Sequence, residues 1–456
     1  MSPYSADRWR PTPALVRCLT VVALTVPVAL LWRRPDLLVL VAPIAVVLGW
    51  SLVTRPKDLP ERRFSLSHRQ VREGEQALAV AEVAAVPGAD LVAAALSPTP
   101  WVEGVPTEKV RAVDDADGLP VTHASAVVDV AGRPAGTPQR VVLGIRATRW
   151  GLRRVGPLQL AAVGDWGSYR FGPVTEDALA LRTLPLPTAF DSRAPAPRPQ
   201  GLVGTHRSSR PGDGTEFATL RPFQVGDRLR RIHWARSTRG EGLYVTSTFA
   251  DQDTHVAVLV DAHYDLGRSE GVRGRPSSLD RSVRAAAAVA EHFLHQGDRV
   301  SLRVLSGRTP LTVPVGTGKR HGVRILDTLC RIVPSVAEET DPRRVHLGVG
   351  DGTLVVMVSA LVSPDALTQA ATLARRGLSV VVVDALVDPT DGTVAPSAER
   401  DALARDAWRI RMLERDREIR AIQAQGVPVV PWLGPGSLDL VLRRLGRRGR
   451  TAGRTA

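Results

Sequence analysis

Cysteine is scarce in this chain: only Cys18 and Cys330 occur among 456 residues. Neither has a partner at the C-x-x-C spacing, so the sequence excludes a disulfide framework and a cysteine-rich zinc site. Aromatic residues make up only 4% of the chain, while hydrophobic residues make up 44%. The cores must therefore be built mainly from Val, Leu and Ala, and the length allows two or three domains.

Lysine is also rare, at Lys57, Lys109 and Lys319, so the formal net charge of +14 comes from arginine. The arginines are spread along the chain except for a run at its end. Nucleic-acid-binding proteins instead gather basic residues into a patch on a recognisable module. The sequence therefore predicts no nucleic-acid partner, and residues 447–456 are expected to form a disordered basic tail.

Two long apolar segments lie near the N-terminus. Residues 13–32 are almost wholly apolar and residues 37–53 carry no charge. Because roughly 20 such residues span a bilayer as a helix, residues 1–54 predict a transmembrane hairpin. The alternative is a signal peptide followed by a core helix, but the segment lacks a small-residue cleavage pattern.

Positive charge sets the orientation of such a hairpin. The turn carries only Arg33 and Arg34, whereas the side that holds both ends is richer in basic residues. Those residues are Arg8, Arg10, Arg55, Lys57, Arg62 and Arg63. We therefore expect a multi-pass protein of the inner or plasma membrane, with the bulk of the chain in the cytoplasm. The reverse orientation would make it an extracellular adhesion module.

The middle of the chain is rich in short strand-like runs, such as 89–96 and 140–148, which Gly and Pro separate. Regular turn signals between short strands are typical of an antiparallel sandwich. We therefore predict a β-rich, sandwich-like domain over 55–190. A linker rich in Pro, Ser, Gly and Arg is expected over 191–213.

The C-terminal part, residues 251–446, alternates between strands and helices. Strands are expected at 254–262, 298–306, 309–315, 353–361, 378–386 and 427–433, and helices at 279–297, 319–333, 364–377, 397–425 and 436–446. The very short connection between the second and third strands predicts a hairpin with one antiparallel edge. Strands that alternate with helices indicate a doubly wound parallel α/β sheet.

This order of elements resembles the von Willebrand factor A domain, which binds a divalent cation at the end of its first strand through Asp-x-Ser-x-Ser. The matching stretch here is DAHYD, with Asp261, His263 and Asp265, and a later strand ends in Ser359. Both serines of the motif are absent, so the resemblance implies a degenerate metal site. We expect no cofactor; Mg²⁺ is the cation that such oxygen ligands would take, and a transition metal suits a set with imidazole. The simpler interpretation is polar capping of strand ends.

Residues 214–250 contain a dense polar motif, EFATLRPFQVGDRLRRIHWARSTR. Bidentate pairs between its carboxylates and arginines would hold a loop in one geometry, with Trp234 and Phe217 as anchors on the sheet. We interpret the motif as a structural clasp or a docking surface. The alternatives are phosphate binding and an acid–base set of Glu216, Asp227 and His233, which needs a pocket and perturbed pKa values.

The same motif resembles the hallmark of the domain-of-unknown-function 58 (DUF58) family. The matching positions are Glu216, Leu220, Arg221, Gly226, Asp227, Arg230, Ile232, Trp234, Ser237 and Arg239. The resemblance extends to the plan of two N-terminal spans, a β-rich section and a von Willebrand factor A-like domain. It implies a partner, a MoxR-type AAA+ ATPase that acts as a chaperone-like remodeller, and it carries over no catalytic residue.

These observations favour a membrane-anchored, non-enzymatic adaptor or scaffold that works with a MoxR-type ATPase in chaperone-like assembly or envelope-related work. The second hypothesis is a membrane-bound hydrolase that uses Glu216, Asp227 or His233. In the α/β domain, the crevice at the strand ends near Asp261 and Ser359 is the expected ligand face. The sequence does not indicate the oligomeric state.

Overall fold

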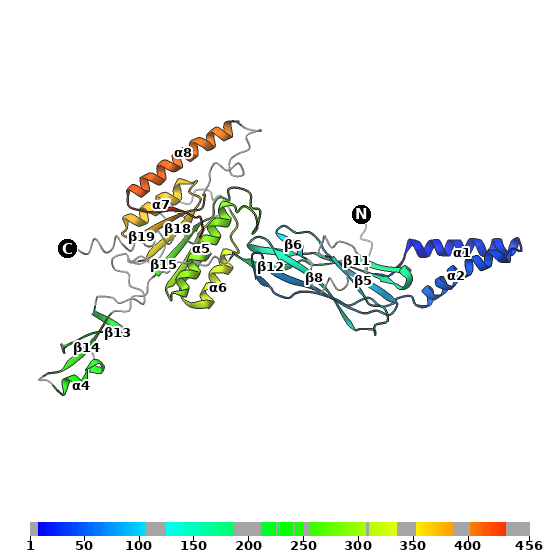
Figure 1. Cartoon of the computed structure of the whole chain (residues 1–456), viewed down its shortest axis with the longest axis horizontal. Coiled ribbons are helices and arrows are strands. Elements are labelled where there is room, and N and C mark those ends of the chain that lie inside the picture. Colours follow the sequence, from blue (N-terminus) through cyan, green and yellow to red (C-terminus); the bar gives the residue numbers. More distant parts are fainter. Residues whose placement is uncertain are drawn as a thin grey trace. The chain divides into compact units, whose positions relative to one another are not determined.

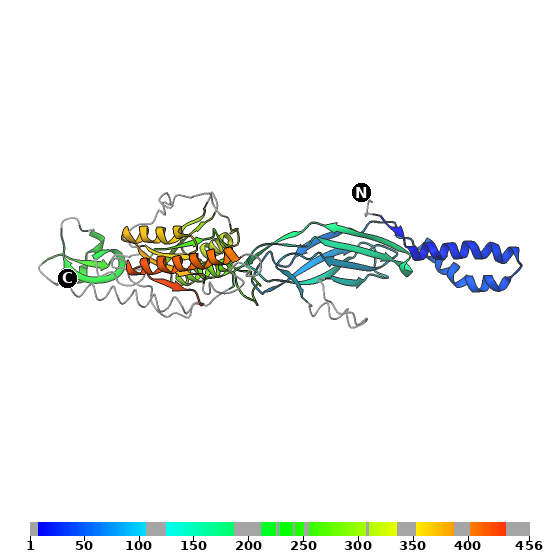
Figure 2. The same cartoon turned by 90° about the horizontal axis from the view of Figure 1, so that it is seen from above.

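The computed structural model describes residues 8–105, 125–186, 211–224, 227, 229–239, 242–249, 255–306, 310–334, 353–386 and 402–434. The chain divides into two compact units, Met1–Leu184 and Pro185–Ala456. Figures 1 and 2 show their elements from two directions.

The first unit begins with two apolar helices, α1 (Pro13–Leu31) and α2 (Pro35–Val53). Each starts with proline at its first helical position, where the missing N–H is not needed, and the Thr12 side chain caps α1. Both helices are long and apolar enough to cross a membrane, and few of their residues are buried. The two predicted apolar helices are confirmed.

The rest of the first unit consists of strands, as predicted for this β-rich region. They are β1 (Arg10–Pro11), β2 (Arg62–Leu66), β3 (Gln70–Arg72), β4 (Gln76–Ala84), β5 (Ala89–Leu96), β6 (Val102–Val105), β7 (Ser125–Asp129), β8 (Pro138–Ala147), β9 (Gly151–Val155), β10 (Leu158–Gly164), β11 (Tyr169–Glu176) and β12 (Leu179–Leu184), with a short 3-10 turn η1 (Asp165–Gly167) between β10 and β11. Two of the sheets have the orders β1-β11-β10-β5-β7 and β2-β4-β8-β6, and β3-β12-β9 form a third.

One hydrophobic core joins the two larger sheets. Along β4 every second residue is buried, from Ala77 to Val83, because successive side chains of a strand point to opposite faces. Leu143 of β8 lies in the same core as Leu160 of β10 and Phe171 of β11. The strands of both sheets therefore bury their inner faces against each other, as in a sandwich.

The second unit begins with an antiparallel hairpin of β13 (Pro211–Pro222) and β14 (Tyr244–Phe249). Their connection contains the 3-10 turn η2 (Leu229–Arg231) and the short helix α4 (Trp234–Ser237). The expected linker therefore ends earlier than predicted, because residues 211–213 belong to β13, and Pro211 and Gly212 already pair with β14. We call residues 211–249 the motif hairpin.

The remainder is an α/β sheet in the order β17-β16-β15-β18-β19-β20. Its strands are β15 (His255–Asp261), β16 (Arg299–Leu305), β17 (Leu311–Gly316), β18 (Leu354–Ser359), β19 (Ser379–Asp384) and β20 (Val429–Pro431). All neighbours are parallel except β16 and β17. The predicted parallel sheet with one antiparallel edge strand is confirmed.

Four described helices accompany this sheet: α5 (Ser278–His295), α6 (Gly318–Leu329), α7 (Pro364–Arg375) and α8 (Ala402–Ala424). Figure 1 shows α5 and α6 on one face of the sheet and α7 and α8 on the other. Because both faces are covered, β18 is buried along its whole length. The predicted helix 436–446, the tail 447–456 and the linker residues 191–210 lie outside the described residues.

Candidate functional site

An ion pair closes the loop of the motif hairpin. Arg221 donates from both terminal nitrogens to Asp227, at 2.7 Å to Oδ2 and 2.5 Å to Oδ1. The Gln224 backbone N–H also donates to Asp227 Oδ2, at 2.8 Å. The Arg221 guanidinium and this N–H lower the pKa of Asp227, and the carboxylate raises the pKa of Arg221. Such a bidentate pair fixes the loop geometry.

A second set of hydrogen bonds fastens α4 to β14. The His233 backbone N–H donates to the Tyr244 carbonyl at 2.8 Å. Ser237 Oγ donates to the His233 carbonyl at 3.0 Å and accepts from the Tyr244 backbone N–H at 2.9 Å. His233 Nδ1 accepts from the Arg236 backbone N–H at 3.2 Å, which caps the helix. One serine hydroxyl thus links two segments of the motif.

Buried apolar side chains also hold the motif hairpin together. Ile232 and Val245 are buried and form a β-bridge. Trp234 is 63% exposed, so the expectation that it anchors the loop is wrong. It is the first residue of α4, and Ile232 supplies the buried contact instead. Leu229 and Leu243 are also exposed, so the motif hairpin presents apolar side chains to solvent.

The remaining motif residues have varied positions. Leu220 and Arg221 are neighbours in β13, where they pair with Thr246 and Val245 of β14. The Arg239 backbone N–H donates to the Arg236 carbonyl at 3.2 Å, just after α4. Four predicted residues have no described side chain: Gly226 lies outside the described residues, and for Glu216, Phe217 and Arg230 only the backbone element is described.

The acid–base trio is not brought together by any described contact. Asp227 is held by Arg221, and His233 uses Nδ1 to cap α4. Among the described hydrogen bonds none joins Asp227 to His233. A general base needs a free acceptor within reach of a substrate proton, and the Asp227 carboxylate is instead occupied by a guanidinium.

The carboxyl ends of the two central strands form a second polar site. Ser359 Oγ, fully buried at the end of β18, donates to Asp261 Oδ2 at 2.6 Å. His263 Nδ1 lies 2.6 Å from Asp261 Oδ1. The hydrogen bond that the Asp261 carboxylate accepts is the main cause that raises the pKa of His263, against the effect of burial. Asp261 therefore joins two side chains at the sheet edge.

Asp265 belongs to a different set of contacts. Its carboxylate accepts from the Leu279 backbone N–H at 3.2 Å, in the first turn of α5. Among the described residues no group of three or more His, Cys, Asp or Glu is arranged to hold a metal ion. Both oxygens of Asp261 are already hydrogen-bonded, which fits strand-end capping better than Mg²⁺ ligation. Cation binding here stays a prediction that this geometry does not favour.

A buried ion pair next to this edge was missed from the sequence. Arg415 of α8 donates to Asp384 at the end of β19 and, at 3.2 Å, to the Ala360 carbonyl. Asp384 stands beside Ser359 in the strand register. Burial raises the pKa of Asp384, and Arg415 opposes that effect. Arg415 lies in a strongly charged helix, so only a run of arginines and carboxylates was visible in the sequence.

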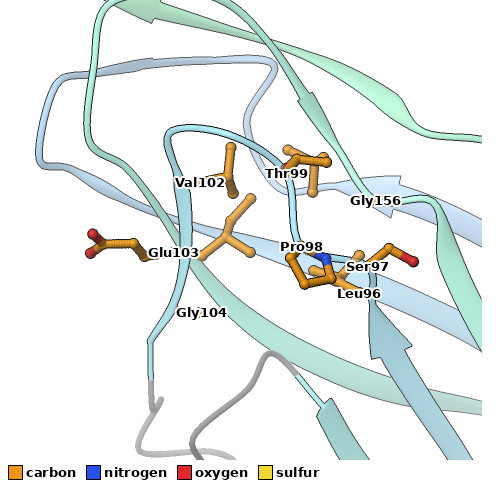
Figure 3. Close-up of a pocket in the computed structure, with 10 residues that line it drawn as sticks. Leu96, Ser97, Pro98, Thr99, Val102, Glu103, Gly104 and Gly156 are labelled. Carbon is orange, nitrogen blue, oxygen red and sulfur yellow. The ribbon is translucent and has the colours of Figure 1, made fainter. Parts of the chain in front are cut away.

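The first unit has a separate pocket of about 610 Å³. Figure 3 shows Glu103 pointing away from Leu96 and Pro98. Its lining residues are Leu96, Ser97, Pro98, Thr99, Val102, Glu103, Gly104, Ile145, Val155 and Gly156. The described lining is mostly apolar, with Ser97, Thr99 and Glu103 as its polar members, and no described hydrogen bond joins these three side chains.

Comparisons with known proteins match part of this chain. Two curated relatives are Uncharacterized protein Rv1480 of Mycobacterium tuberculosis and Uncharacterized protein Mb1516 of Mycobacterium bovis, each 29% identical over 187 residues. The matched part covers 41% of this chain and 51% of each relative, so the chain spans about half the length of the curated relatives it matches. Residues 219–421, from β13 to α8, match the family described as Protein of unknown function DUF58.

Proposed function

We propose that this protein is a membrane-anchored, non-enzymatic adaptor whose motif hairpin binds a partner protein. In this proposal α1 and α2 cross the inner or plasma membrane, and the strands of the first unit and the whole second unit lie in the cytoplasm. The orientation is supported by the excess of arginine and lysine next to the N-terminal end of α1 and the C-terminal end of α2.

The observation that carries the proposal is that, in the motif hairpin, polar side chains are hydrogen-bonded within the hairpin while large apolar side chains are exposed. Its polar side chains Arg221, Asp227 and Ser237 are bonded to one another or to backbone. Its large apolar side chains Leu229 and Trp234 are exposed. Exposed aromatic and aliphatic groups beside polar side chains that are already hydrogen-bonded have the properties of a binding surface, where Trp is often a dominant contact.

The charge of the same surface favours an acidic partner. Arg236 stacks over the Tyr244 ring, with its guanidinium carbon 5.5 Å from the ring centre. Arg236 and Arg239 are both exposed, and arginine beside aromatic residues is enriched at protein interfaces. We therefore expect a partner surface with carboxylates around an apolar pocket for Trp234. The resemblance to DUF58 proteins makes a MoxR-type AAA+ ATPase the proposed partner.

We also infer that the α/β sheet is of the von Willebrand factor A type. Numbered from β15, its strand order is 3-2-1-4-5-6, with the third strand antiparallel at one edge. In such doubly wound sheets, ligands bind at the carboxyl ends of the strands where the order reverses. That point lies between β15 and β18, where Asp261 bonds to Ser359, so this edge is the proposed second contact for the partner.

Co-purification tests the proposal. The full chain in detergent is mixed with a MoxR-type ATPase from the same genome, and retention is compared for wild type and Trp234→Ala. Leu152→Ala is the control, because Leu152 is also an exposed apolar residue but lies on β9 of the first unit. The proposal expects loss of retention for Trp234→Ala alone. Equal retention of all three proteins would show that the hairpin does not bind the ATPase.

The same proteins distinguish an adaptor from a hydrolase. In the adaptor proposal His233→Gln leaves any turnover by the purified chain unchanged, since His233 has a capping role. Hydrolysis of an added ester or peptide substrate that disappears in His233→Gln would support the hydrolase instead.

A further inference from the structure

Trp166 is a large apolar side chain, 72% exposed, in the turn η1 of the first unit. It occupies the left-handed backbone region, with φ 57 and ψ 22. Bulky residues rarely adopt this conformation, and such outliers persist where the surrounding structure enforces them, often at functional sites. The next residue, Gly167, has φ 64. Two consecutive left-handed residues turn the chain sharply and leave the indole ring in solvent.

The turn η1 lies next to the ends of the two apolar helices. Thr12, the N-cap of α1, donates from its backbone N–H to the Ser168 carbonyl at 2.9 Å. Its hydroxyl donates to the Gly167 carbonyl at 2.7 Å. The turn η1 also contacts α2, and Figures 1 and 2 both show the β10–β11 connection beside the near ends of α1 and α2. The turn that carries Trp166 therefore lies beside the N-terminal end of α1 and the C-terminal end of α2, where the apolar segments of both helices begin.

Basic residues surround the same end of the first unit. Arg10 and Arg170 are partners in the register of β1 and β11, and Arg55 lies over the Tyr169 ring at 5.6 Å. Charged residues near this end include Arg8, Arg10, Arg55, Lys57 and Arg170, and the acidic residues Asp58, Asp90, Asp129 and Asp165. Burial, followed by the hydrogen bond with Asp165, raises the pKa of Asp90.

We propose that η1 inserts Trp166 into the headgroup layer of the phospholipid bilayer, as a third membrane contact beside α1 and α2. Tryptophan is favoured at this depth because its ring is apolar and its N–H finds polar partners, while arginine and lysine meet lipid phosphates. The contact would fix the β-rich region against the membrane surface. This inference rests on the proposed membrane anchoring and does not involve the motif hairpin.

The test uses the full chain in phospholipid nanodiscs. In a Cys18→Ala, Cys330→Ala background, an environment-sensitive fluorophore is attached at Trp166→Cys. The matched control is Leu152→Cys, an exposed site on β9, which pairs with β12; Figure 1 places β12 away from α1 and α2. We expect a blue-shifted emission and several-fold quenching by a headgroup spin label at position 166 only. Water-like emission at both positions would overturn the inference.

A second measurement keeps the other native tryptophans. Brominated lipids quench tryptophan fluorescence at the bilayer, and we expect Trp166→Phe to lose part of the quenchable signal while Trp234→Phe loses none. Equal quenchable signals in both variants would overturn the inference. Retention of the chain in washed membranes is measured in parallel. A chain that washes off refutes both the anchoring and this contact, whereas a retained chain with an unquenched Trp166 refutes the contact alone.

Discussion

The backbone of Gly88 lies so close to that of Thr54 that a Cβ atom on Gly88 would stand 2.1 Å from the Thr54 carbonyl oxygen. Gly88 has φ +80 and lies in the turn between β4 and β5, and Thr54 is the C-cap of α2. The Asp165 backbone N–H donates to the Gly88 carbonyl at 3.1 Å. Helix α2, the β4–β5 turn and η1 therefore meet at one glycine.

We expect Gly88→Ala to disrupt this junction. The added methyl group clashes with backbone, which cannot move as a side chain can, and the positive φ adds strain. Destabilisation on the order of 3 kcal/mol is expected, measured by thermal unfolding of the full chain in detergent.

Gly132→Ala is the control for this substitution. Gly132 has φ +66 and open space around the position of a Cβ atom. Its substitution therefore measures the cost of the backbone strain without a clash, and we expect a destabilisation of about 1 kcal/mol. Equal destabilisation by both substitutions would show that the close approach of Gly88 to Thr54 has no energetic role.

The pair of Arg221 and Asp227 is expected to order the loop of the motif hairpin. Arg221→Ala should increase amide exchange at His233 and Tyr244, whose bonds hold α4 to β14, and Asp227→Ala should do the same. Because each removes the same interaction, the double variant should exchange no faster than either single one. If the increase in the logarithm of the exchange rate for the double variant equals the sum of the increases for the two single variants, the two residues have independent roles.

The same pair predicts a pH dependence. The pKa of Asp227 is lowered in the fold, chiefly by Arg221, so its stabilising effect is complete above the unfolded aspartate value of about 4. The effect is lost as the pH falls through the lower folded pKa. Hairpin amide protection should therefore persist at mildly acidic pH and decline only below that value. Loss of protection between neutral and mildly acidic pH would contradict this assignment.

The buried pair of Arg415 and Asp384 should be sensitive to removal of one partner. Arg415→Met leaves a carboxylate without its cation, which costs about 3–5 kcal/mol. Since burial already raises the pKa of Asp384, acid protonates it more readily in the folded state. The variant should therefore recover stability as the pH falls, which chemical denaturation at several pH values measures.

Arg415→Met with Asp384→Leu is the matched double variant. Removal of both charges should restore most of the stability at neutral pH, since an apolar pair can replace a buried ion pair. A double variant as unstable as Arg415→Met would show that packing of the arginine stem, rather than charge, is decisive.

Much of the fold was accessible from the sequence because local signals agreed with tertiary structure. The run from Leu354 to Ser359 is apolar throughout and forms a fully buried strand. Helix α7 starts at Pro364 and is followed by Gly377, as predicted. These features depend on propensity and burial, which a single segment displays.

Other features depend on contacts that no local pattern reveals. Strand β13 contains two glycines and few apolar residues, and only its pairing with β14 makes it a strand. Arg415 has the sequence environment of a surface residue, yet it is buried against Asp384 from a different element. In the candidate site, the sequence predicted pairs between carboxylates and arginines, of which Arg221 with Asp227 is one. It did not predict that Trp234 is exposed.

The central claim is that the motif hairpin binds a partner protein through Trp234. The most direct measurement is the dissociation constant between the nanodisc-embedded chain and a MoxR-type ATPase, for wild type, Trp234→Ala and Leu152→Ala. We predict at least a roughly tenfold weaker affinity for Trp234→Ala and the wild-type value for Leu152→Ala. An affinity that is the same for all three proteins, or a complete lack of binding by wild type, would contradict the claim.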